Sequence, residues 1–265
     1  MIPTRKFAAV LLATVAAAAA IAFSVHAQPQ IQLPMPAPQP TAPTSTLNHN
    51  LILLDPAHGG PDPGTTFSDH TLEKDITLAL AARLRTALTA AGFTVVATRD
   101  SDPSDPLTPD QRAETANRTH AVACIVLHAT ATGSGVHIYT SKLQPPSPDE
   151  DAYPSAYVPI PWESAQAASV DQSHRLAANL ASALTKGNLP VLSGHAPLRP
   201  LDNLMCPAVA IELAPLLNPA GDPTSPADSD YQQRVGAALT SALQAWRDQA
   251  EPQAQSAQPS KMGAR

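Results

Sequence analysis

The chain has 265 residues and a formal net charge of −6. This acidic balance leaves no basic stripe that could follow a phosphate backbone, so the composition argues against a nucleic-acid partner. When both ends of the chain are set aside, about 200 residues remain, which is enough for one α/β domain with a substantial core.

Residues 1–27 have the pattern of an export signal. Arg5 and Lys6 form a charged start, residues 7–25 are uncharged and rich in alanine, and Val25-His26-Ala27 ends in a small-x-small cleavage pattern. The nineteen uncharged residues also approach the ~20 that span a bilayer, so an uncleaved membrane anchor is the alternative. In either case we expect an exported domain, periplasmic or extracellular and associated with the cell envelope.

The boundaries of the folded part follow from the composition of its flanks. Residues 28–49 are rich in Pro and Gln and have no hydrophobic period, which is typical of an extended linker. Residues 249–265 also lack such a pattern, and we expect them to be a disordered tail. A single folded domain is therefore expected over residues 50–248.

The first predicted strand is the apolar run of residues 51–54, which breaks at Asp55-Pro56-Ala57-His58-Gly59-Gly60. His58 therefore lies just past the carboxyl end of a strand, where α/β proteins keep their sites. Leucine and isoleucine then recur at helical spacing from Leu72 to Leu88. This spacing predicts a helix that has Glu73 in its first turn.

Two strands and a short helix follow. Residues 93–99 are expected to be a strand, and Thr108-Pro109-Asp110-Gln111 combines a capping-box pattern with proline at the first helical position. These residues predict a short helix that ends at Asn117. The apolar run of residues 121–127 predicts the next strand, which is closed by His128.

The second half continues the alternation. Residues 135–140 alternate in the way of an edge strand. The Pro-rich residues 142–162 predict a surface loop, and an irregular loop of this length is often functional. A helix is expected over residues 163–186, the last apolar strand over residues 207–213 and a closing amphipathic helix over residues 231–246. The predicted fold is therefore α/β, a single domain with a mostly parallel twisted sheet flanked by helices on both faces.

Three side chains with metal-binding chemistry stand at breaks of this pattern, namely His58, Glu73 and His128. Two imidazoles and a carboxylate match an open catalytic zinc site, in which three protein ligands leave one position for water. Their spacing has no local zinc motif, so such a site would have to be assembled by tertiary folding. Taken singly, they are also explained as a turn residue, a helix-dipole carboxylate and a polar residue at a strand end.

Glu212 lies inside the apolar run of residues 207–213. An ionised carboxylate in such a strand is unfavourable unless it has a partner or a chemical task. A buried ion pair and a catalytic carboxylate are both consistent with this placement.

Five separated motifs together resemble the zinc-dependent N-acetylmuramoyl-L-alanine amidases (amidase type 3), and the resemblance covers residues 50–246. Each motif falls at a strand edge or a helix start, and the order is that of the family. The motifs are Leu53-Leu54-Asp55-Pro56-Ala57-His58-Gly59-Gly60, Glu73-Lys74-Asp75, Thr98-Arg99-Asp100, Leu127-His128-Ala129 and Ile211-Glu212-Leu213.

The resemblance implies a cell-wall hydrolase that cleaves the amide bond between N-acetylmuramic acid and L-alanine in peptidoglycan. It implies Zn²⁺ as the cofactor and His58, Glu73 and His128 as the metal ligands. It also implies that Glu212 is the catalytic base, which takes a proton from the attacking water and returns it to the leaving amine. Peptidoglycan or a muropeptide is then the partner, and a protein activator stays undefined. Some members of the family carry a regulatory helix that covers the zinc, and the prolines of residues 142–162 disfavour one here.

The sequence departs from the family pattern at Ala57, Thr130 and Ala214-Pro215, where the family has glycine, asparagine and a Gly-Phe pair. None of these changes removes a ligand or the base, but Thr130 and Pro215 would flank the cleft and affect how substrate is positioned. Two other functions therefore stay open from the sequence. One is a non-catalytic peptidoglycan-binding module, and the other is a zinc hydrolase that acts on exported peptides or acylated sugars.

For the remaining polar residues and the cysteines, the sequence offers weaker support for a functional role. Arg199 precedes the last strand and is consistent either with binding a substrate carboxylate or with a solvated surface. His70 lies near Glu73, where we expect a cap-region residue rather than a support of the metal site. Cys124 and Cys206 are either a disulfide, which an oxidising compartment permits, or two buried thiols. No motif supports the other histidines in the domain, which are His120, His137, His174 and His195.

Overall fold

The computed structural model describes residues 48–145 and 161–256, which fall within one compact unit that begins at Ser45. The expected signal of residues 1–27, nearly all of the linker, most of the loop 142–162 and the end of the tail lie outside these residues. Within the described ranges, none of the helices has the combination of length and hydrophobicity needed to cross a membrane.

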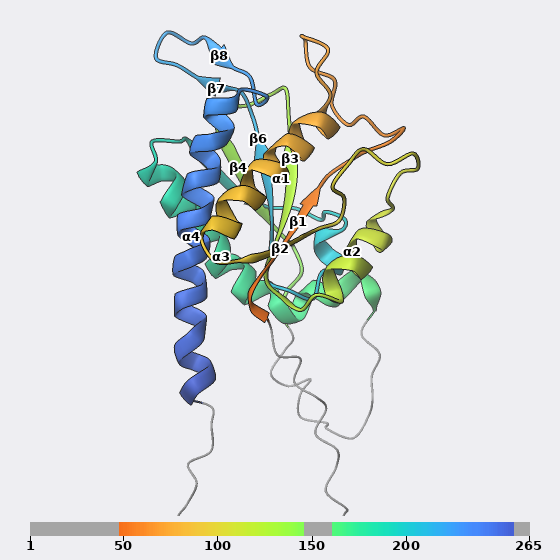
Figure 1. Ribbon diagram of the computed structural model, residues 1–265, viewed down its shortest axis with the longest axis vertical. Coiled ribbons are helices and arrows are strands. Elements are labelled where there is room, and N and C mark those ends of the chain that lie inside the picture. The colour runs from red at the N-terminus through yellow and green to blue at the C-terminus, as the bar shows by residue number, and fades with distance from the viewer. Residues whose placement is uncertain (1–47, 146–160, 257–265) are drawn as a thin grey trace, which may run out of the picture. The chain divides into compact units, whose positions relative to one another are not determined.

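The described part contains a six-stranded sheet, four α-helices, two 3₁₀ helices and a small hairpin (Figure 1). The sheet consists of β1 (Asn48–Pro56), β2 (Thr94–Ala97), β3 (Ala121–Ala129), β4 (Val136–Thr140), β5 (Val191–His195) and β6 (Ala208–Leu213). The helices are α1 (Glu73–Ala90), α2 (Pro109–Asn117), α3 (Val170–Lys186), α4 (Ser229–Ser256), η2 (Trp162–Ser169) and η3 (Leu201–Asn203), and the hairpin pairs β7 (Leu216–Leu217) with β8 (Pro223–Thr224).

The sheet has the strand order β2-β1-β3-β6-β4-β5. The first four strands in this order are parallel, β4 runs antiparallel to β6, and β5 is parallel to β4. This confirms the mostly parallel sheet. The expectation that residues 135–140 form an edge strand is wrong, because β5 pairs with the outer side of β4. Residues 191–195, which form that edge, were not predicted to be a strand.

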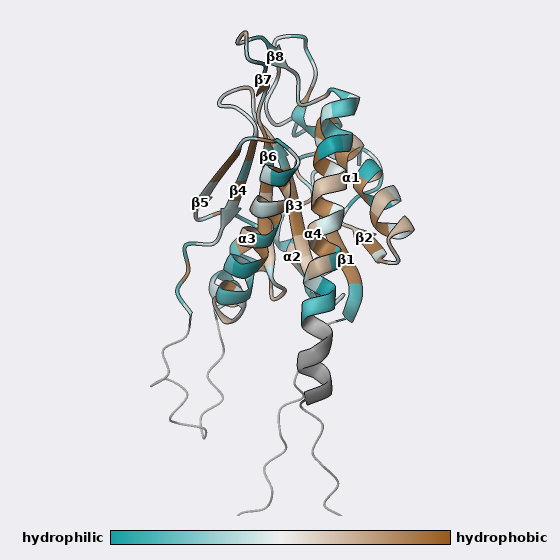
Figure 2. Ribbon diagram, turned by 90° about the vertical axis from the view of Figure 1, so that its left-hand side faces the viewer, coloured by the Kyte–Doolittle hydropathy of each residue, from teal (hydrophilic) through white to brown (hydrophobic). Residues whose placement is uncertain are grey.

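Two sets of helices cover the two faces of this sheet. On one face, α1, α3 and α4 bury a large apolar cluster that includes Leu80, Leu180 and Leu239. On the other face, α2 and η3 pack against a smaller cluster that includes Leu53 and Val126. Figure 2 shows hydrophobic strands between helices whose outer sides are hydrophilic. Helices on both faces are therefore confirmed, and the two layers differ in extent.

Several helix ends differ from the sequence prediction. The capping box and Pro109 begin α2 as expected, and Asn117 ends it. The helix predicted over residues 163–186 is instead the 3₁₀ helix η2 followed by α3, which starts at Val170. The last helix, α4, continues to Ser256 and so includes the first residues of the expected disordered tail.

The connection of residues 130–135 passes over the carboxyl end of β6, because β3 and β4 lie on either side of that strand. The backbone N–H of Thr130 donates to the carbonyl of Leu213 at 2.9 Å, and that of Gly135 donates to the carbonyl of Pro215 at 3.1 Å. These bonds hold the connection against the end of β6.

Cys124 and Cys206 form a disulfide, with Cα atoms 6.1 Å apart, and both residues are buried. This decides between the two alternatives that the sequence left open. The bond joins β3 to the segment that leads into β6, and these neighbouring strands carry His128 and Glu212.

Candidate metal centre

Three polar side chains, those of His128, Glu212 and His137, lie side by side on the sheet near the carboxyl ends of β3 and β6. Glu212 on β6 is the Cα partner of His128 on β3 and of His137 on β4, so the three side chains lie in one row on the same face. This is the face of α2. Apolar residues of β3 and β6 that precede this row, such as Val126 and Ala208, belong to the same buried cluster as residues of α2 and η3. The carboxyl ends stay open, and the side chains of His128 and Glu212 are 29% and 27% exposed.

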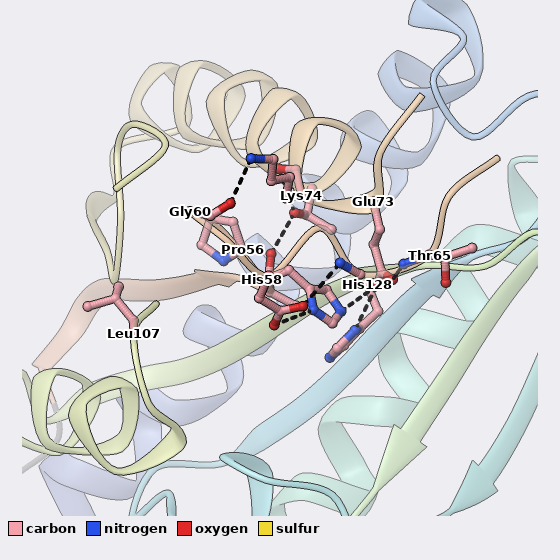
Figure 3. A network of polar contacts seen from close by, with 12 residues as sticks. Pro56, His58, Gly60, Thr65, Glu73, Lys74, Leu107 and His128 are labelled. Atoms are coloured by element: carbon pink, nitrogen blue, oxygen red, sulfur yellow. Dashed lines mark hydrogen bonds and ion pairs between the residues drawn. The ribbon is translucent and has the colours of Figure 1, made fainter. Parts of the chain in front are cut away.

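The three expected metal ligands are together. Nε2 of His58 lies 3.2 Å from Oε1 of Glu73, and Nδ1 of His128 lies 2.9 Å from the same oxygen (Figure 3). One ligand atom from each residue falls within 4.8 Å of the other two. Two imidazole nitrogens and a carboxylate oxygen are the donor set that zinc takes in open sites. The residues present therefore fit a zinc ion.

Glu73 is the most buried of the three residues, with 4% of its surface exposed. Burial alone would raise the pKa of its carboxyl, but hydrogen bonds from His128, from His58 and from the backbone N–H groups of Thr65 and Ala129 hold that pKa well below its usual range. The backbone bonds measure 2.9 Å from Thr65 and 3.1 Å from Ala129. The carboxylate is therefore ionised at neutral pH, as a metal ligand must be.

Asp62 supports His58 from the side away from Glu73. Nδ1 of His58 donates to Oδ2 of Asp62 at 2.9 Å, which leaves Nε2 directed to Glu73. The bond with Glu73 raises the pKa of His58 most, burial acts in the opposite direction, and the bond with Asp62 adds to the rise. A carboxylate behind a ligand histidine fixes its tautomer and ring orientation. No role for Asp62 was predicted from the sequence, although a carboxylate four residues after His58 was a usable signal.

The loop after β1 has an unusual backbone. His58 and Gly64 have φ of +62° and +64°. A Cβ on Gly64 would come within 2.6 Å of Cδ2 of His58 and 2.7 Å of Oε2 of Glu73. Glycine at this position thus lets the loop pass close to two of the three clustered residues, His58 and Glu73.

Two arginines hold this loop through its carbonyl groups. Nη2 of Arg112 donates to the carbonyl of His58 at 2.7 Å, while its Nη1 pairs with Asp55 at 2.7 Å. Nη2 of Arg99 donates to the carbonyl of Ala57 at 2.9 Å. Both arginines are buried, so these bonds are shielded from water and fix the strained backbone at His58. Arg99 belongs to one of the family-like motifs, for which the sequence alone offered no role.

Lys74 ties the same loop to the start of α1. Its Nζ donates to the carbonyl of Gly60 at 2.8 Å, as Figure 3 shows, and pairs with Oδ2 of Asp102 at 2.7 Å. The other oxygen of Asp102 accepts the backbone N–H of Gly60 at 2.6 Å. Two consecutive residues in the first turn of α1 therefore have different tasks. Glu73 belongs to the cluster that it forms with His58 and His128, and Lys74 holds the loop of His58 in place.

Glu212 is neither fully buried nor alone. Its Oε2 accepts a hydrogen bond from Nδ1 of His137 at 2.8 Å. His137 is buried, and no role for it was predicted from the sequence. The alternation of residues 135–140 was a signal that His137 faces one side of the sheet, but the strand pairing that places it on Glu212 is not visible in the sequence.

Arg199, His70 and His195 do not belong to the cluster of candidate metal ligands. Arg199 is exposed, 3.9 Å from Glu163, and precedes the amino end of β6, the end opposite to Glu212. His70 is an exposed residue of a turn with φ of +64°. Nδ1 of His195 bonds Oγ1 of Thr140 at 2.6 Å, also at the amino end of β6.

The chain was compared with known proteins. The family model for N-acetylmuramoyl-L-alanine amidase matches residues 52–245. A germination-specific N-acetylmuramoyl-L-alanine amidase of Bacillus subtilis is 36% identical over 102 residues, which cover 33% of this chain and 42% of the relative. The N-acetylmuramoyl-L-alanine amidase AmiC of Neisseria meningitidis is 33% identical over 98 residues, which cover 35% of this chain and 23% of the relative. The matched part thus spans less than half the length of either relative.

Solved structures share the fold. The N-acetylmuramyl-L-alanine amidase Ami1 of Mycobacterium smegmatis superposes with a TM-score of 0.57 at 19% identity, covering 75% of this chain and 97% of that one. The catalytic domain of CwlV, an amidase from Bacillus (Paenibacillus) polymyxa, gives a TM-score of 0.54 at 19% identity, with 75% and 98% covered. The family match extends over most of the chain and includes every residue of the metal cluster and Glu212. The chain therefore belongs to the N-acetylmuramoyl-L-alanine amidase family.

Proposed function

We propose that this protein is a zinc-dependent peptidoglycan hydrolase. Its reaction is cleavage of the amide bond between the lactyl group of N-acetylmuramic acid and the L-alanine of the stem peptide. The observation that carries the proposal is the convergence of His58, Glu73 and His128 beside a further carboxylate, Glu212, which is the Cα partner of His128. Family membership supports the choice of bond.

The three clustered residues would hold the zinc ion. When bound there, the ion would polarise the scissile carbonyl and make a water molecule acidic enough to attack at neutral pH. Glu73 supplies the negative charge of the donor set, and Asp62, which accepts the Nδ1 proton of His58, would leave Nε2 as the nitrogen that binds the ion. The buried arginines keep the loop of His58 in place while substrate binds.

Glu212 is the proposed general base and acid. One of its oxygens accepts a proton from the attacking water, and the same proton then passes to the amine of L-alanine as the amide bond breaks. Its position on the open part of the sheet face gives both water and substrate access, and the side chain is 27% exposed. A carboxylate with a purely structural task would not need that access.

The experiment that tests this function is digestion of purified muropeptides by the zinc-loaded protein, followed by mass analysis of the products. The expected result is release of the intact stem peptide with a free amino group on L-alanine. Binding without any product would instead support a peptidoglycan-binding module. Cleavage of acylated sugars or exported peptides, with the muramoyl-alanine bond intact, would support the other hydrolase.

The metal assignment has a separate test. Elemental analysis should find one zinc per chain, and His58→Ala and His128→Ala should each lose it while circular dichroism stays that of the folded protein. Stoichiometric zinc in both variants would show that the ligand set is wrong.

Export is also part of the proposal, because substrate lies outside the cytoplasm. The pattern of residues 1–27 predicts that Gln28 begins the processed chain. N-terminal sequencing of protein purified from cells checks this, and an intact Met1 in the membrane fraction would favour an anchor. The prolines of residues 142–162 further predict that this loop shapes the rim of the cleft without covering the zinc, so the domain should be active without an activator. A large rise in turnover when the loop is deleted, at constant zinc content, would show that the loop is inhibitory.

A further inference from the structure

A histidine and a carboxylate are paired beside the metal cluster by the antiparallel register of β4 and β6. His137 and Glu212 are Cα partners, and Nδ1 of His137 donates to Oε2 of Glu212 at 2.8 Å. On its other side, Glu212 is the Cα partner of His128. Glu212 thus lies between a proposed metal ligand and a histidine that has no part in the metal cluster.

The two oxygens of Glu212 have different surroundings. Oε2 is bonded to His137, whereas Oε1 makes no hydrogen bond or ion pair with the residues that the structure describes. The Glu212 side chain is 27% exposed and that of His137 only 9%. The bonded oxygen therefore faces a buried donor, and Oε1 is the oxygen available to water and substrate.

Two neighbouring residues limit the position of the His137 ring. Tyr139, on the same face of β4, lies edge-on to it with the ring centroids 6.3 Å apart. Gly133 has φ of +83°, and a Cβ there would come within 2.8 Å of Cε1 and 3.1 Å of Nε2 of His137. A side chain at residue 133 would displace the ring, so the glycine leaves the space that the ring occupies.

We propose that His137 is a positioning residue, which fixes the carboxylate of Glu212 so that Oε1 is directed to the attacking water. A free glutamate side chain would leave that position by rotation about its own bonds, and a displacement of about 1 Å in an active site can lower the rate about 100-fold. Glu212 alone carries the proton from the attacking water to the leaving amine, and Nδ1–H of His137 donates to Oε2 throughout. This inference rests on the proposed function, because it assigns His137 to the same reaction.

The test compares two substitutions in the zinc-loaded full chain. His137→Leu removes the donor, while His137→Asn places an amide N–H close to the position of Nδ1. With muropeptide as substrate, His137→Leu should lower kcat about 10- to 100-fold with KM within about twofold, and His137→Asn should bring kcat back to within about fivefold of the wild type. A kcat within twofold of wild type in His137→Leu, or a His137→Asn variant as slow as His137→Leu, overturns the proposal.

The chain offers a matched control in His195. Its Nδ1 also bonds a neighbouring side chain, Oγ1 of Thr140 at 2.6 Å, but at the amino end of β6. His195→Leu should leave kcat and KM within twofold of wild type. A loss equal to that of His137→Leu would show that any broken histidine bond in this part of the sheet slows the enzyme, and would overturn a specific role.

A second readout does not depend on turnover. In the metal-free protein, nitrogen NMR of the imidazole rings should show His137 protonated at Nδ1, with shifts that change in Glu212→Ala. An Nε2-protonated ring, or shifts unchanged in Glu212→Ala, would overturn the pairing.

The same assay separates this inference from the proposed function. Wild-type protein that does not release stem peptide contradicts the function, and the NMR result then still decides the pairing. Slow Glu212→Gln with normal His137→Leu contradicts only the role of His137. If both ideas hold, His137→Leu causes no further loss when it is added to Glu212→Gln, because there is no base left to position.

Discussion

The two faces of the sheet are built for different tasks. The face under α1, α3 and α4 carries the large apolar cluster, whereas the face under α2 and η3 carries the smaller one. On the carboxyl half of that second face lie His128, Glu212 and His137. Because most of the apolar core lies on the first face, the second face can carry exposed polar groups at the strand ends. Substitutions on the two faces should therefore affect different quantities.

The largest effect is expected on the open half of the second face. Glu212→Gln keeps the shape of the side chain but removes the proposed base, so turnover should fall on the order of 10²- to 10⁴-fold. Zinc content and the free energy of unfolding should stay at wild-type values. Steady-state kinetics on muropeptide measure the turnover, elemental analysis measures the zinc content, and urea denaturation measures the free energy of unfolding. Turnover within threefold of wild type would remove Glu212 from the mechanism.

The opposite result is expected in the large cluster. Leu180 on α3 is fully buried there, and Leu180→Ala should lower the free energy of unfolding by about 2–5 kcal/mol, through lost burial and a residual cavity. Turnover of the protein that stays folded should be unchanged. Leu192→Ala is the control, because this leucine on β5 is exposed. Equal destabilisation by both variants, measured in urea, would contradict the assignment of stability to the first face.

The disulfide lies on the face that carries the smaller apolar cluster. Cys124 and Cys206 enclose a long stretch of chain, with a sequence separation of 82. Replacing both by alanine should lower the free energy of unfolding by about 2–4 kcal/mol, mainly because the unfolded chain gains freedom. A reductant present during denaturation should have a similar effect on the wild type. A midpoint in urea that does not move under either treatment would mean that the smaller cluster holds this face without the bond.

The smallest effect concerns zinc affinity alone. A methyl group in Gly64→Ala would press on His58 and Glu73, so we expect about 10- to 100-fold weaker zinc binding, similar to other losses of ligand support. Gly221→Ala is the matched control, because Gly221 also has a positive φ of +90° but nothing within 4 Å of the added Cβ. Competition with a chelator measures both. Equal affinity in the two variants would show that close packing under the ligands does not shape the site.

The parts of the site that the sequence predicted share a common property. His58 and His128 each follow an apolar run, and Glu73 starts a periodic helix. In a mostly parallel sheet, strand ends of this kind meet at one edge, so the local pattern predicted that His58 and His128 lie close together. The parallel sheet and its helical layers were predictable for the same reason. The choice of these two residues and Glu73 as a set rested on the resemblance to the family, and the three are together in the structure.

The parts that the sequence did not predict depend on strand pairing. His137 meets Glu212 only because β4 is inserted antiparallel between β6 and β5, and nothing in residues 135–140 encodes that neighbour. The edge strand β5 was missed because Ser193, Gly194 and His195 interrupt its apolar character. Arg112 likewise holds the loop of His58 by a tertiary contact, from more than fifty positions away in the chain.

Six residues connect β3 to β4 and border the site, and the chain should not be lengthened there. Their backbone is bonded to Leu213 and Pro215, so an insertion there would have to break bonds at the end of the strand that carries Glu212. The exposed turn of residues 218–222 between β7 and β8 is different, since its residues are solvent-facing and bond mainly to one another. For engineering, an epitope tag or an additional wall-binding module is best inserted in that turn, and residues 130–135 are best varied only by substitution.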